Sequence, residues 1–86
     1  MNFEYDPTKS ATNKSKHGID FQEAQQLWKE PFLLRIPSKY ESEKRFLFIV
    51  KIEQKHWSAI TTYRGETVRI ISVRKAIKEE IEIYES

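Results

Sequence analysis

Hydrophobic and polar positions change their spacing near residue 32, and this change divides the chain into a helical part and a sheet. Between residues 20 and 31 the apolar side chains recur every three or four positions, which is typical of the apolar stripe of a helix. After residue 32 they form short runs and alternations with a period of two, which are typical of strands. Near the end of the chain the helical spacing returns. The pattern predicts helices at both ends and an antiparallel sheet between them.

The first helix is expected at roughly residues 7–17. Asp6 is a good N-cap residue, and Pro7 suits the first helical position. Gly18 supplies a C-terminal stop. Because Ala11 is the only apolar residue between Pro7 and Gly18, this helix has little apolar surface of its own. It must therefore rely on its flanking segments for packing.

The second helix is expected to begin at Asp20, which has the spacing of a capping box with Glu23. Pro31 ends it, because proline cannot donate the hydrogen bond that a helix interior needs. Its apolar stripe consists of Phe21, Ala24, Leu27 and Trp28.

Four strands and a last helix are expected after residue 31. The clearest strand holds the run Phe46-Leu47-Phe48-Ile49-Val50, which suits a central strand covered on both faces. Pro31 and Pro37 bound the first strand, residues 38–43 form a polar loop, and Gly65 marks a tight hairpin turn. The expected strands cover residues 32–36, 45–52, 56–63 and 67–73. The last helix is expected to bury the face that holds Ala76, Ile77, Ile81 and Tyr84.

These elements predict an α+β fold with two N-terminal helices, an antiparallel sheet of about four strands and a C-terminal helix. With 86 residues, the chain is expected to form one domain over residues 1–86. Its composition, 38% hydrophobic and 33% charged, is that of a globular protein. No apolar run approaches the ~20 residues of a membrane span, and the first residues lack the features of a signal peptide. A cytoplasmic protein with no membrane partner is expected.

The charge of the chain is unevenly spread. Residues 29–75 hold eleven Lys and Arg against five acids, a net charge of +6, whereas residues 1–28 carry −1 and residues 76–86 carry −3. Such a basic body suits an anionic partner, nucleic acid first. A solvated basic surface without a partner explains the charge alone equally well.

Lys16 and His17 end the first expected helix. The helix dipole favours the cationic form of an imidazole there, and such a histidine could act as a general acid or stabilise a phosphate. The simpler alternatives are a stabilising role for His17 at the helix end and a solvated surface position for Lys16.

Arg69 and Arg74 lie in or beside the last expected strand. A guanidinium binds phosphate oxygens bidentately and keeps its charge, which suits phosphoryl chemistry. The alternative is a structural ion pair with Glu79 or Glu80. Because positions 69 and 74 differ in parity, they are expected to converge only if Arg74 lies beyond the strand end. Ser72 is expected to be a hydrogen-bonding strand residue and not a nucleophile.

Four further residues are candidates for a site. Glu43 and Arg45 stand at the entry to the central strand, where they could form an acid/base group with a phosphate clamp or an ordinary surface salt bridge. Arg64 lies in the expected hairpin turn, as an RNA-binding side chain or a solvated one. Trp57 could stack on a nucleobase, although an indole is more often part of a core.

No metal site and no cofactor are expected. The absence of cysteine excludes disulfides and thiolate zinc sites, and the two histidines lie far apart in the sequence. A nuclease with this sequence is therefore expected to be metal-independent. RNA suits such an enzyme better than DNA, because its 2′-OH is an internal nucleophile. The protein has only to orient this hydroxyl, stabilise the charge on the phosphate and assist the leaving oxygen.

Four strings in this chain, in this order, resemble the BrnT family, the ribonuclease toxins of bacterial type II toxin–antitoxin modules. The first is Phe3-Glu4-Tyr5-Asp6-Pro7, and the second is Asn13 with Lys16-His17-Gly18-Ile19 and Phe21-x-Glu23-Ala24. The third is Glu43-Lys44-Arg45-Phe46, and the last is Arg69-Ile70-Ile71-Ser72-Val73-Arg74-x-Ala76 with Glu80 and Tyr84. The resemblance covers nearly the whole chain.

The resemblance implies a RelE-like fold, RNA cleavage that arrests translation, and neutralisation by a BrnA-like antitoxin. That antitoxin is expected to carry a DNA-binding domain, often of ribbon-helix-helix type, so that operator DNA is bound only through it. The site residues that the resemblance supports are Lys16, His17, Glu43, Arg45, Arg69 and Arg74. The alternatives are a non-catalytic RNA- or ribosome-binding module, an inactive toxin relative, and a structural domain whose partner is a protein.

Overall fold

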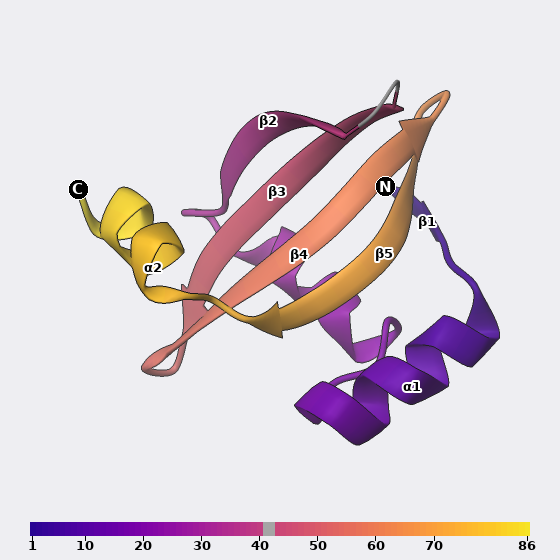
Figure 1. Ribbon diagram of the computed structural model, residues 1–86, viewed down its shortest axis with the longest axis horizontal. Coiled ribbons are helices and arrows are strands. Elements are labelled where there is room, and N and C mark those ends of the chain that lie inside the picture. Colours follow the sequence, from indigo (N-terminus) through magenta and orange to yellow (C-terminus); the bar gives the residue numbers. More distant parts are fainter. Residues whose placement is uncertain (41–42) are drawn as a thin grey trace.

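The computed structural model describes residues 1–40 and 43–86 and contains a five-stranded sheet with helices on both faces (Figure 1). The strands are β1 (Asn2–Glu4), β2 (Leu34–Tyr40), β3 (Glu43–Ile52), β4 (Lys55–Arg64) and β5 (Thr67–Lys75). The helices are α1 (Pro7–His17), the 3₁₀ helix η1 (Glu23–Lys29) and α2 (Lys78–Glu85). The strand order is β1-β5-β4-β3-β2, and every neighbouring pair is antiparallel except β1 with β5. The predicted α+β class is confirmed.

The first helix, α1, begins and ends where the sequence predicts. The Asp6 carboxylate accepts a 2.8 Å hydrogen bond from the Thr8 N–H, and Gly18 ends the helix at φ 78°. The buried residues of α1 are polar, Ser10 and Asn13. This helix is therefore fixed to the rest of the protein by hydrogen bonds, as its lack of apolar residues requires.

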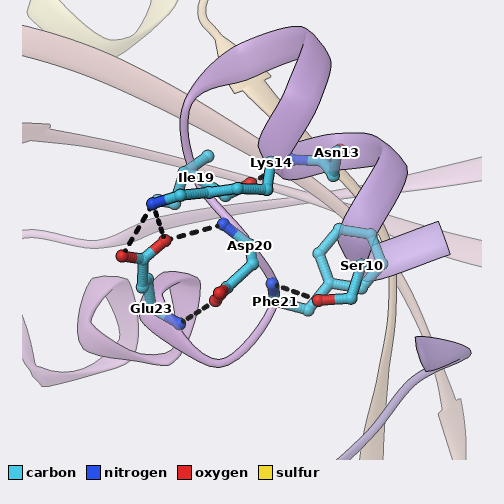
Figure 2. A network of polar contacts seen from close by, with 7 residues as sticks. All are labelled: Ser10, Asn13, Lys14, Ile19, Asp20, Phe21 and Glu23. Carbon is cyan, nitrogen blue, oxygen red and sulfur yellow. Dashed lines mark hydrogen bonds and ion pairs between the residues drawn. The ribbon is translucent and has the colours of Figure 1, made fainter. Parts of the chain in front are cut away.

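The second helix, η1, is a 3₁₀ helix and not an α-helix. Its start has the predicted reciprocal hydrogen bonds, from the Asp20 N–H to Glu23 (2.9 Å) and from the Glu23 N–H to Asp20 (2.7 Å) (Figure 2). Lys14 binds the same Glu23 carboxylate at 2.8 Å and ties α1 to η1. The buried side chains here are three positions apart, the spacing that a 3₁₀ helix aligns on one face: Phe21, Ala24 and Leu27.

Two strand predictions near the sheet edges were wrong. Strand β1 was missed, because three residues carry no readable period; it pairs in parallel with the start of β5. The strand expected at residues 32–36 lies instead at Leu34–Tyr40 and includes Pro37. An edge strand tolerates proline, because one side of it needs no ladder hydrogen bonds. The expected loop at 38–43 is therefore strand at 38–40 and at Glu43, and its residues 41 and 42 lie outside the described residues.

A β-bulge in β5 changes which residues share a face. On the neighbouring strand β4, Ile60 lies opposite Ser72 and Thr61 lies opposite Ile70, so Ile71 is an extra residue. Val68, Ile70 and Val73 consequently all enter the core, despite their mixed parity. Arg69, Ser72 and Arg74 then share the opposite face. The expectation that Arg74 must lie beyond the strand end was wrong, because Arg74 lies within β5.

The core lies between η1 and one face of the sheet, and α2 covers part of the other face. Phe48 and Val50 of β3 pack in the core cluster, while the intervening Ile49 is fully buried on the opposite side. The prediction that β3 is covered on both faces is confirmed. For α2 the predicted apolar face was wrong in part, because Ile77 is 49% exposed and Glu80 is buried.

Candidate functional site

The face of the sheet opposite η1 carries four arginines, and it is called the arginine face below. Arg69 and Arg74 come from β5, before and after the bulge respectively, and Arg64 ends β4. Arg45 lies two residues before Leu47, which is opposite Ile60 of this face. Alternation along the strands and the bulge together bring these four guanidinium groups to one side.

A hollow of about 370 Å³ opens on the arginine face, beside α2, and is called the central hollow. Arg45 and Arg74 contribute its charged lining, and Glu80 of α2 forms part of the wall. Apolar side chains contribute the rest, including Ile36, Leu47 and Ile60. An apolar surface beside guanidinium groups can receive a base and its phosphate together.

Arg74 is held rigidly by Glu80. Two hydrogen bonds of 2.7 and 2.9 Å join the guanidinium to both carboxylate oxygens, and Glu80 also accepts bonds from the Ser58 hydroxyl (2.8 Å) and the Ile77 N–H (2.9 Å). Arg74, with Ile77 and Ser58, outweighs the effect of burial and lowers the pKa of Glu80 from 4.5 to about 2. Glu80 is therefore a carboxylate at neutral pH and a poor proton carrier. Of the two ion pairs that the sequence allowed, the structure has the one with Glu80.

Glu4 of β1 joins two other arginines. Its Oε2 atom lies 2.7 Å from Arg69 Nη1 and 3.5 Å from Arg64 Nε. The Arg64 side chain is 66% exposed, whereas that of Arg69 is 30% exposed. Sequence reasoning missed this role of Glu4, because it depends on the parallel pairing of β1 with β5, where Glu4 lies opposite Arg69.

Glu43 and Arg45 form the ion pair that was the simpler of their two expected arrangements. The Arg45 Nε atom lies 3.0 Å from Glu43 Oε2, and the Glu43 side chain is about half exposed. Pairs with an exposed partner contribute only about 0–1 kcal/mol, so the half-exposed Glu43 carboxylate adds little to the stability of the fold.

Lys16 and His17 lie at the side of β5, in a second hollow of about 220 Å³ that is called the edge hollow. Both side chains are exposed, and Ile71 and Ser72 of the bulge line the same hollow. Since Ser72 lies opposite Ile60 of the central hollow, the two hollows flank one pair of strands. The structure thus brings Lys16 and His17 beside the arginine face but in a separate depression.

Asn13 fixes α1 in this place. Its amide donates 2.8 Å hydrogen bonds to the Val73 and Ile19 carbonyls and accepts one of 3.2 Å from the Val73 N–H. Figure 2 shows Asn13 and Ile19 in the same corner as Ser10, which accepts a hydrogen bond from the Phe21 N–H. The Asn13 amide thus bonds the main-chain N–H and carbonyl of Val73 in β5, as the backbone of a neighbouring strand would. An Asn in a helix with a single apolar residue, Ala11, was the signal in the sequence for this role.

Trp57 lies away from the arginines. It packs against the core cluster on the face that η1 covers, in register with Val50 of that cluster. Its stacking on a nucleobase stays a prediction. His56, the neighbouring residue, binds Glu85 of α2 at 2.6 Å and contacts the Tyr84 ring edge-on.

Within residues 1–40 and 43–86, no group of three or more His, Cys, Asp and Glu side chains could hold a metal ion. None of the helices in this part of the chain has the length and apolar character needed to cross a membrane.

Comparison with known proteins gives one family. Residues 5–80 match the family model described as a ribonuclease toxin, BrnT, of a type II toxin–antitoxin system. No curated protein matches the chain. The matched segment covers most of the chain and contains every residue that lines the two hollows. Glu4, which binds Arg69, lies just before it.

Proposed function

The chain belongs to the BrnT family of ribonuclease toxins of type II toxin–antitoxin systems, and from this premise we propose that it is a metal-independent endoribonuclease whose cleavage of RNA arrests translation. The observation that carries the proposal is the arginine face with its central hollow, where Arg45 and Arg74 stand beside an apolar surface. Guanidinium groups supply the positive charge that a metal ion would otherwise provide to a phosphodiester in its transition state.

The proposed reaction uses the 2′-OH of the RNA. Its oxygen attacks the adjacent phosphorus and loses a proton to a base, while the 5′-oxygen leaves and takes a proton from an acid. The products are a 2′,3′-cyclic phosphate and a free 5′-OH. Positioning and charge stabilisation are sufficient catalytic devices for this step, because the nucleophile is already attached to the substrate.

We assign roles to the site residues on the same basis. Arg45, Arg69 and Arg74 hold the scissile phosphate and stabilise its developing charge, with Lys16 beside them. His17 or Glu43 moves the protons. Glu80 is not assigned a proton, because its pKa of about 2 makes it too weak a base; it acts as a positioning residue for Arg74. The exposed Arg64 guides the RNA strand.

The toxin–antitoxin family implies an antitoxin partner. We propose that this partner is BrnA-like, that it carries the DNA-binding domain, and that operator DNA is reached only through it. We also propose a cytoplasmic location, where RNA and antitoxin both occur, and a RelE-like relationship for the fold.

The test is inducible expression in a bacterial host, with growth and total RNA followed over time. Wild type is expected to stop growth and fragment RNA, and Arg45→Ala to do neither while keeping its circular dichroism spectrum. Arg74→Ala is a weaker probe, because it also releases Glu80 and lowers stability. The matched control is Arg35→Ala, which removes an arginine that lies over Phe46 on the other face.

Two results would contradict the proposal. Normal growth and intact RNA at full expression of wild type would reject the toxin. Growth arrest with intact RNA would favour the other candidate, a non-catalytic RNA- or ribosome-binding module.

A further inference from the structure

Among the described residues, the cations of the edge hollow differ from the arginines in having no carboxylate partner. Lys9 and Lys16 are seven residues apart on α1, two helical turns, and therefore line the same side of the helix. Among the described residues, neither lysine forms an ion pair. Lys14, on another side of α1, is instead bound to Glu23. Two unpaired lysines that line one hollow point to an anionic ligand.

The edge hollow continues the arginine face. The bulge at Ile71 turns Ser72 toward this face, and Ser72 lines the edge hollow together with Lys9. Its partner across the strands, Ile60, lines the central hollow. A chain lying across β3, β4 and β5 would therefore pass from Arg45 to Ser72 and reach α1.

We propose that the Lys9 end of the edge hollow is a second phosphate subsite, which binds the backbone of a single RNA strand at a phosphate beyond the cleaved bond, on the far side of Lys16. This inference rests on the proposed function. The variant that tests this subsite is at Lys9, because Lys9 lies two helical turns from Lys16 and is not assigned to the reaction. A single strand is required because a base can enter the central hollow only when it is unstacked.

The dimensions of the face set the length of the substrate. Neighbouring strands lie ~4.8 Å apart and a helix with its side chains is ~10 Å wide. The path from Arg45 on β3 to Lys9 on α1 is therefore roughly 15–20 Å. Such a path takes several nucleotides, so a dinucleotide held at the cleavage site does not reach Lys9.

The test measures binding of non-cleavable 2′-O-methyl RNA strands of two and about twelve nucleotides, across a range of salt concentrations. Lys9→Ala is expected to weaken binding of the long strand and to reduce its salt slope by about 0.7, the value for one phosphate contact of a single strand. Lys9→Glu is expected to weaken it further. Binding of the short strand stays unchanged. Lys29→Ala, an exposed lysine on η1, is the matched control and is expected to change neither strand.

Three results would overturn the inference. One is an unchanged salt slope for the long strand in Lys9→Ala, and another is an equal loss for short and long strands. The third is a loss of antitoxin affinity alone, which would assign the lysines to a protein partner. Failure of the proposed function is seen separately, since wild type would then bind these strands without cleaving unmodified RNA.

Discussion

Replacing Glu80 by glutamine removes the charge that anchors α2 and Arg74 while keeping the shape of the side chain. Glu80 accepts four hydrogen bonds, two from Arg74 and one each from Ser58 and Ile77, and its side chain is only 10% exposed. Glutamine has one carbonyl oxygen and an amide group. The amide can accept only one of the two Arg74 hydrogen bonds, and its NH₂ group, a donor, then faces the second N–H of the guanidinium.

The size of the effect follows from the pKa of Glu80, which falls from 4.5 to about 2. At about 1.36 kcal/mol for each unit, the folded state favours the carboxylate over a neutral group by about 3 kcal/mol. A chain of this length has a total stability of about 4–13 kcal/mol. Glu80→Gln is therefore expected to lose a large part of it, with a fall in Tm of roughly 10–20 °C.

Urea denaturation at neutral pH, followed by tryptophan fluorescence, measures this loss. The control is Glu82→Gln, an exposed glutamate on the same helix, which is expected to change the free energy of unfolding by less than about 0.5 kcal/mol. Because the folded pKa is lowered, the contribution of Glu80 is complete above pH 4.5 and is lost as the pH falls toward 2. A Glu80→Gln protein as stable as wild type at neutral pH would refute the reasoning.

Three other changes test separate parts of the structure. Asn13→Ala is expected to lower the free energy of unfolding by about 2–4 kcal/mol in urea denaturation, because Val73 loses two hydrogen bonds. A loss below about 0.5 kcal/mol would show that Asn13 does not hold the edge of β5. Gly18→Ala is expected to cost about 1 kcal/mol by the same measurement, because φ is 78°; unchanged stability would contradict this. Glu4→Gln is expected to tighten RNA binding a few-fold in fluorescence anisotropy, because Arg69 loses a competing carboxylate whose ion pair is worth at most about 1 kcal/mol. Weaker RNA binding would argue against Arg69 as part of the site.

The sequence predicted those elements whose signals are local. The cap at Asp6 and the stop at Gly18 fixed the bounds of α1, and the apolar run of β3 identified a strand covered on both faces. Local signals fail where distant pairing decides the structure. Pro37 predicted the end of a strand because proline has no N–H for the ladder of hydrogen bonds. The strand continues through it because β2 lies at the edge of the sheet.

The candidate site could be predicted only in its residue types. The bulge at Ile71, which brings Arg69 and Arg74 to one face, has no signature in a run of β-branched residues. Glu4 is distant in sequence from Arg69 and reaches it only through the parallel pairing of β1. The pair of Arg74 with Glu80 was foreseen as an alternative, because six residues separate them across the turn into α2.

The most direct test of the central claim is cleavage by the purified protein of a synthetic RNA in the presence of EDTA. The same RNA with a single 2′-deoxy substitution at the mapped cleavage position serves as the comparison. A metal-independent transesterification predicts cleavage of the unmodified strand, a 2′,3′-cyclic phosphate on its upstream product, and no cleavage at the 2′-deoxy position. Cleavage that requires added metal, or that persists at the 2′-deoxy position, would contradict the account.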